Sequence, residues 1–276
     1  MLEKFKYTNH VGETLEFGVG SLFANENELR NFSWSVNSKN DRISGFTKGI
    51  VPKTIPIVLK CQSAEEGVAL KNRIFEVFEK DVLAMQHGKI AIGDYYLKCF
   101  VTDSSKSSYL INKGLLMLEI TVQTDFPEWI KETTTAFRHN DDEEAENGFL
   151  DFAFDFPFDF KNGLSTGFLN NTNFVASNFR IVIYGEVSNP TLFIGGHEYS
   201  VNVDVAKGEF LTIDSVNKTV ILTKNNGQKV NCFNARNKDS YIFEKIPSGE
   251  VAINSTNEGI SFDITLLEER SEPKWT

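Results

Sequence analysis

The chain has 276 residues, of which 41% are hydrophobic, so it can bury one large core or two of ordinary size. Its net charge of −10 gives it no electrostatic reason to bind nucleic acid or an anionic membrane surface. It shows neither the apolar N-terminal segment of a signal peptide nor an apolar run of about 18 residues that could span a membrane.

The first 130 residues are expected to form one domain of strands with a single helix. Apolar and polar residues alternate around 5–7, 15–17 and 32–37, which is the period of a half-buried strand. The segment 38–56 is polar and is interrupted by glycine and proline. This composition favours a flexible loop, and the alternative is an extended arm that reaches a neighbouring subunit.

A short strand at 57–59 is followed by the helix. Ser63 and Glu66 have the spacing of a capping box, which predicts the helix N-terminus. The next apolar residues fall on one helical face, typical of core packing, and Gly88 marks the end. The apolar residues on this face are Leu70, Ile74, Val77 and Phe78.

A tight hairpin is predicted at 92–95, where Gly93-Asp94 separates two apolar segments. It leads into a strand at 95–101, and a long strand is predicted at 114–125. Pro127 ends this block, because proline cannot extend a ladder of backbone hydrogen bonds.

Residues 131–148 are expected to be an acidic linker between two domains. The carboxylates of 141–146 form a run that is usually solvated and extended. A calcium site is disfavoured because the spacing is not that of an EF-hand loop. We predict no metal site and no other cofactor.

Residues 151–160 alternate phenylalanine with aspartate, alanine and proline. In an extended strand all five rings would share one face, which a sheet of the same chain or a neighbouring subunit would have to cover. The carboxylates on the other face are interpreted as a solvated row rather than a catalytic pair. The residues on the aromatic face are Phe152, Phe154, Phe156, Phe158 and Phe160.

Residues 149–276 are expected to form a second domain of strands and turns. Their short spacing and the turn residues between them suit a β-sandwich. Aromatic residues at the rim of such a sandwich can stack on sugars, and the candidates are Tyr199, Phe233, Tyr241 and Trp275. The strands are predicted at 179–184, 191–194, 199–203, 210–213, 219–222, 251–254 and 260–267.

Motifs of the common catalytic sites are absent from the sequence. There is no GxSxG elbow, no P-loop, no GxGxxG and no HExxH, and the four histidines are scattered. A glycosidase needs two carboxyl groups at a set separation, and the sequence gives no way to select a pair. We therefore predict no enzyme activity and no catalytic residue, and a sandwich-fold glycosidase ranks last.

Several segments together resemble the siphovirus-type distal tail proteins of phages and prophages of Gram-positive bacteria. The resemblance spans nearly the whole chain and rests on the order and spacing of its segments. They are the Trp34 strand, the capped helix ending at 77–81 (VFEKD), the hairpin at 93–96 (GDYY), and the segments 126–129 (FPEW), 155–160 (DFPFDF), 241–249 (YIFEKIPSG) and 269–275 (ERSEPKW).

This resemblance implies a mainly-β protein of two domains. Residues 1–130 would be a β-sandwich-like domain with one helix and an extended hairpin that forms a hexameric ring. Residues 149–276 would be a galectin-like β-sandwich. The segment near Arg42, Phe46 and Lys53 becomes a candidate belt between subunits, together with the aromatic row at 152–160.

The implied function is a structural baseplate ring at the distal end of the tail tube of the virion. Its partners would be further copies of itself, the tail-tube protein and the tail-associated hub or lysin protein, with a receptor-binding protein as a further partner. DNA would only pass through the lumen, and synthesis would occur in the bacterial cytoplasm. A contractile tail or a phage-derived bacteriocin is a variant of this hypothesis. The alternative is a carbohydrate-binding module for host cell-wall glycans.

Overall fold

The computed structural model describes residues 4–24, 27–110, 115–138 and 167–275. They form two compact units, one of Met1–Lys131 with Glu269–Thr276 and the other of Glu132–Glu268. Strands dominate both units, and α1 is the one α-helix among the described residues. The expected mainly-β fold with a minor α part is therefore confirmed. No described helix combines the length and the apolar character that a membrane span requires.

The first unit is built from antiparallel strands that share one long member, β8. The first residues of β8 pair with β7 and the rest pair with β9, so β8 joins the series β2–β1–β7–β8 to the series β3–β6–β9–β8. The strands are β1 (Phe5–Thr8), β2 (Thr14–Phe17), β3 (Leu22–Ala24), β4 (Ser35–Lys39), β5 (Arg42–Thr47), β6 (Lys53–Lys60), β7 (Gly88–Ile92), β8 (Tyr95–Leu110) and β9 (Leu115–Gln123).

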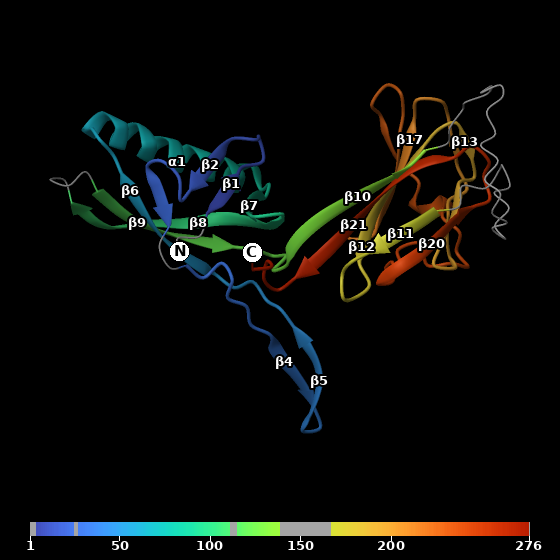
Figure 1. Ribbon diagram of the computed structural model, residues 1–276, viewed down its shortest axis with the longest axis horizontal. Helices are drawn as coiled ribbons and strands as arrows, with labels where there is room; N and C mark the ends of the chain where they lie inside the picture. The colour runs from blue at the N-terminus through green and yellow to red at the C-terminus, as the bar shows by residue number, and fades with distance from the viewer. Residues whose placement is uncertain (1–3, 25–26, 111–114, 139–166, 276) are drawn as a thin grey trace, which may run out of the picture. The chain divides into compact units, whose positions relative to one another are not determined.

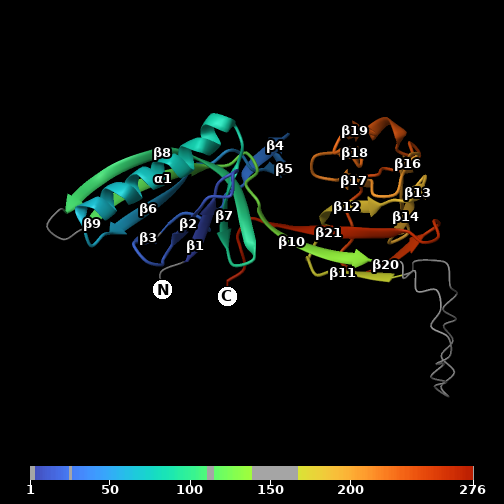
Figure 2. The ribbon, with the colours of Figure 1, turned by 90° about the horizontal axis from the view of Figure 1, so that it is seen from above.

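The helix α1 (Ala64–Ala84) lies across β6, β8 and β9 in both views of the first unit (Figures 1 and 2). It begins as predicted, because the Ser63 Oγ accepts a hydrogen bond from the Glu66 N–H at 3.1 Å. The Glu66 carboxylate accepts from the Gln62 N–H at 2.7 Å and from the Ser21 hydroxyl at 2.9 Å, and these contacts, with a smaller contribution from the Ser63 backbone N–H, lower the pKa of Glu66. The side chains that α1 buries are Ile74, Val77, Phe78 and Asp81.

The last turn of α1 carries a fully buried carboxylate, Asp81. Asp81 accepts hydrogen bonds from the Tyr7 hydroxyl at 2.5 Å and from the His10 N–H at 2.8 Å, and the His10 Nδ1 lies 2.6 Å from the same carboxylate. A β-carbon at Gly88 would overlap with both the Tyr7 hydroxyl and the Asp81 carboxylate. Burial, followed by the hydrogen bond to Asp81, raises the pKa of Tyr7 above its ordinary value.

The second unit is a β-sandwich. One sheet has the order β19–β18–β17–β12–β21–β10 and the other the order β11–β20–β14–β15, and one core takes side chains from both sheets. A small pair, β13–β16, is separate. The strands are β10 (Trp129–Phe137), β11 (Gly167–Asn171), β12 (Asn178–Tyr184), β13 (Val187–Ser188), β14 (Thr191–Ile194), β15 (His197–Ser200), β16 (Asp204–Val205), β17 (Phe210–Asp214), β18 (Thr219–Thr223), β19 (Lys229–Asn231), β20 (Gly249–Ser255) and β21 (Ser261–Arg270).

Several boundaries differ from the predicted ones. Strand β6 begins at Lys53 rather than at 57 because it pairs with β9 along its full length, and β8 extends nine residues beyond 101 because its residues from Phe100 to Leu110 pair with β9. The predicted linker is wrong at its start, where 131–137 belong to strand β10. The C-terminal residues Glu269–Thr276 group with the first unit rather than the second.

Candidate functional site

The segment predicted as a loop contains a tight β-hairpin instead, and we call residues 34–47, which are this hairpin and the residue before it, the arm. Strand β4 pairs with β5 across a two-residue turn, Asn40-Asp41, which Lys39 and Arg42 close. Both turn residues have positive φ, 52° and 55°. A primed hairpin turn requires this conformation, and asparagine and aspartate tolerate it better than most residues. Figure 1 shows the arm extending away from the sheets of the first unit.

One face of the arm is apolar. Val36 lies opposite Phe46, and a bulge shifts the register so that Ile43 lies opposite Ser38. Residues directly opposite one another, and residues two apart on one strand, share a face. Trp34 continues the row before Val36, and its ring meets that of Phe46 edge-on at 6.4 Å. We call Trp34, Val36, Ile43 and Phe46 the apolar face of the arm.

The apolar face of the arm lies open to solvent. Its four side chains are 47–64% exposed, and every residue of β4 is exposed. The half-buried strand predicted at 32–37 is therefore wrong, because an isolated two-stranded ribbon has no layer beneath it. Contiguous exposed apolar surface of this kind marks an interaction site in soluble proteins.

Lys48 fastens the root of the arm to the first unit. Its Nζ lies 2.7 Å from the Glu128 carboxylate, donates to the Ser271 Oγ at 2.7 Å, and sits 4.3 Å from the centre of the Trp34 ring. The Lys48 side chain is only 8% exposed. The arm therefore starts from a fixed point and holds its apolar face in place.

Lys48→Met is expected to destabilise the first unit by about 1–3 kcal/mol, because the Glu128 carboxylate loses its cation. Backbone amides of the arm should then exchange with solvent faster, which hydrogen–deuterium exchange measures. Lys39→Met at the exposed arm tip is the matched control and should change neither property. Equal exchange in both variants would show that Lys48 does not anchor the arm.

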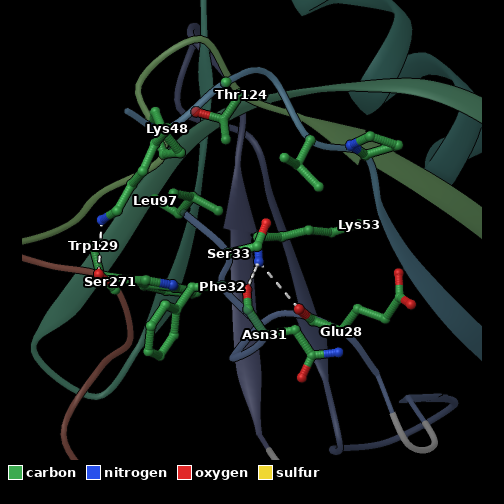
Figure 3. Close-up of a pocket in the computed structure, with 14 residues that line it drawn as sticks. Glu28, Asn31, Phe32, Ser33, Lys48, Lys53, Leu97, Thr124, Trp129 and Ser271 are labelled. Carbon is green, nitrogen blue, oxygen red and sulfur yellow. Dashed lines mark hydrogen bonds between the residues drawn. The ribbon is translucent and has the colours of Figure 1, made fainter. Parts of the chain in front are cut away.

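A cavity of about 160 Å³ lies at the root of the arm (Figure 3). The segments that flank the arm line it, together with Leu97 of β8, Trp129 of β10 and Ser271. Lys53, predicted as a surface contact of the arm, lies here instead and is 9% exposed. It donates to the backbone oxygens of Glu28, at 3.2 Å, and Asn31. Burial lowers the pKa of Lys53.

Two of the predicted sugar-stacking residues lie where they cannot form a rim of the second unit. Tyr199 is fully buried in the core, and its hydroxyl donates to the Glu244 backbone oxygen at 2.8 Å. Trp275 belongs to the first unit, where the Arg30 guanidinium covers its ring at 3.9 Å. The expectation of a stacking surface is therefore wrong for Tyr199. Trp275 is 73% exposed, and for it only the expected position on the second domain is wrong.

Tyr241 is the exposed aromatic of the predicted set in the second unit, 55% exposed. Its neighbours are Phe243, whose ring lies 5.9 Å away, and Lys218 at 5.4 Å. Phe233 is partly buried and stacks on Phe243. A single exposed ring does not favour glycan binding over a protein contact. Within the described ranges no three acidic, histidine or cysteine side chains cluster as metal ligands would.

The structure brings together only part of the predicted interface. Arg42 and Phe46 lie on the arm, and Arg42 is at its tip. The aromatic row of Phe152, Phe154, Phe156, Phe158 and Phe160 lies outside the described residues. Ile43 and Lys48 were not among the residues predicted from the sequence. The sequence did contain a signal for a hairpin that includes Ile43, because residues able to pair as strands flank the turn-forming pair Asn40-Asp41.

Solved structures resemble this chain over nearly its whole length. The Dit protein of phage SPP1, described as a paradigm of the hub adsorption apparatus in phages that infect Gram-positive bacteria, aligns with a TM-score of 0.61 and 10% identity over 96% of this chain and 99% of that one. A chain of the phage P2 baseplate in its activated conformation with Ca gives 0.60 and 12% identity over 99% and 100% of the two chains. The same baseplate with Sr gives 0.55 and 12% over 95% and 97%.

No protein-family model and no curated protein matches the chain. At 10–12% identity the likeness to the solved structures is one of fold. It extends over both units, since it covers at least 95% of the chain in each of the three comparisons. The chain therefore has the fold of the SPP1 Dit protein and of the phage P2 baseplate chain, as its resemblance to distal tail proteins predicted.

Proposed function

We propose that this chain is a non-enzymatic structural subunit of a phage tail tip that assembles with copies of itself into a hexameric ring. Two facts support the proposal. The fold is that of hub and baseplate proteins of phages, and the first unit holds out an arm with an uncovered apolar face.

The open apolar face on an anchored arm is the observation that carries this function. Each large apolar side chain that moves from water into an interface contributes about 1.5–3 kcal/mol. A hairpin of one copy that packs on the next copy gives a head-to-tail contact, and such contacts form a ring when the rotation between neighbouring copies closes. Arg42 at the tip and Phe46 on the apolar face are then contact residues. Lys53 is not a surface contact in this arrangement, because it lies buried in the pocket at the root of the arm.

In the proposed assembly the ring sits at the distal end of the tail tube in the virion. One side binds the tail-tube protein and the other binds the tail-associated hub or lysin protein. The net charge of −10 suits a ring whose lumen passes DNA without retaining it.

Sedimentation of the full-length chain over rising concentration, followed by negative-stain microscopy of the heaviest species, tests this function. We expect self-association that ends at a hexamer, with ring-shaped particles. A species that stays monomeric at the highest soluble concentration, alone and with a tail-tube protein added, would overturn the proposal.

A further inference from the structure

A second cavity, of about 230 Å³, lies in the first unit between α1 and the strands β8 and β9, and we call it the helix groove. Four of its six apolar residues are buried, whereas Phe75 and Val82 are 60% and 37% exposed. These two residues are seven positions apart, so they lie on the same side of α1. The apolar residues that line the helix groove are Ile74, Phe75, Phe78, Val82, Val101 and Leu118.

The helix groove matches the apolar face of the arm in character and in length. Phe75 and Val82 are about 10 Å apart along the helix axis, at a rise of about 1.5 Å per residue. Ile43 and Phe46 are about 10 Å apart along β5, at about 3.3 Å per residue. Each surface is therefore long enough to cover the other, and both gain by leaving water.

The charges of the two surfaces favour one orientation. The arm tip carries a net positive charge, from Lys39 and Arg42 against one aspartate. Along the helix groove, Lys71 lies one turn before Phe75 and Glu79 lies one turn after it. The last turn of α1 contains no basic residue, and the C-terminal end of a helix carries a partial negative charge. The one acidic and one basic residue that β8 adds to the groove balance each other. An arm in the helix groove therefore points its tip toward the C-terminal end of α1.

The arm extends away from the helix groove of its own chain. Figure 1 shows α1 and the arm on opposite sides of β8 and β9 in the first unit. Lys48 fastens the root of the arm on that side through Glu128 and Ser271. An arm that fills a helix groove must therefore come from another copy of the chain.

We propose that the helix groove of each copy receives the apolar face of the arm of the next copy, with Trp34 and Phe46 against Phe75. This inference rests on the proposed function, because it names the surface that accepts the arm in the ring. Each copy then presents one arm and one groove on different surfaces, which is the arrangement that a head-to-tail contact requires.

The groove variant, Phe75→Ser with Val82→Ser, tests the acceptor. Both side chains are partly exposed, so the chain should stay folded, which circular dichroism checks. Its self-association in sedimentation equilibrium should be about 100-fold or more weaker than that of the parent chain. Leu83→Ser is the matched control, because Leu83 is 78% exposed on the same helix and does not line the groove. This control should assemble as the parent chain does.

A mixture of two variants tests whether the arm and the helix groove bind each other. The arm variant, Trp34→Ser with Phe46→Ser, keeps its groove, and the groove variant keeps its arm. Each alone should be monomeric at concentrations where the parent chain assembles. Their equimolar mixture should form a one-to-one complex and nothing larger, because each pair retains one intact arm and one intact groove.

A mixture that stays monomeric, or a groove variant that assembles like the parent chain, would overturn this inference and leave the proposed ring unaffected. A parent chain that stays monomeric would overturn the proposed function, and this inference with it. The variants and the parent chain thus report the two failures separately.

Discussion

Replacement of both Trp34 and Phe46 by serine is expected to give a folded chain that no longer self-associates. The two rings are 47% and 57% exposed and contact each other edge-on, so their loss removes most of the aromatic surface of the arm without opening a core. At about 1.5–3 kcal/mol for each buried side chain, one interface loses about 3–6 kcal/mol. That weakens association by about 100-fold or more, which sedimentation equilibrium would detect.

The opposite face of the same arm supplies the control. Ser35 and Thr47 lie directly opposite each other on the polar side of the hairpin. Exchanging the two, as Ser35→Thr with Thr47→Ser, preserves composition and should leave self-association as in the parent chain. If the aromatic double variant assembled as well as this control, the apolar face of the arm would have no part in assembly.

Local signals in the sequence were sufficient to predict the elements whose boundaries depend on residues close by in the chain. Ser63 caps α1, and Gly93, with a φ of 55°, occupies the turn between β7 and β8. The residues of the arm favoured a flexible loop over the extended arm, which remained the alternative, for a physical reason. A hairpin was expected to show apolar segments on both sides of its turn, and Arg42–Thr47 is mostly polar with only Ile43 and Phe46 in the row.

The candidate site depends on contacts between residues far apart in the chain. Lys48 meets Glu128 across 80 residues and Ser271 across 223 residues. No periodicity or motif encodes these distances, so the anchoring of the arm could not be predicted. Burial causes the same difficulty at Lys53 and Tyr199. Lysine and tyrosine side chains are often partly exposed, and only the tertiary packing decides whether a particular one is buried.

Asp81→Ala should destabilise the first unit by about 3–5 kcal/mol. The change removes the acceptor of the buried Tyr7 hydroxyl and of the His10 N–H, so both donors are left without a partner inside the protein. It also leaves His10 without the carboxylate 2.6 Å from its ring nitrogen. Urea denaturation followed by circular dichroism measures the free energy of unfolding.

Two further variants separate the network from helix propensity. Glu76→Ala changes an exposed carboxylate of the same helix and should alter the free energy of unfolding by less than about 0.5 kcal/mol. Combining Tyr7→Phe with Asp81→Ala removes the donor together with its acceptor. The pair should therefore cost less than the sum of the two single changes, with a coupling free energy of about 0.5–3 kcal/mol. Strict additivity would mean that the hydrogen bond between Tyr7 and Asp81 does not hold α1 to β1, and that the carboxylate stabilises the fold through His10 alone.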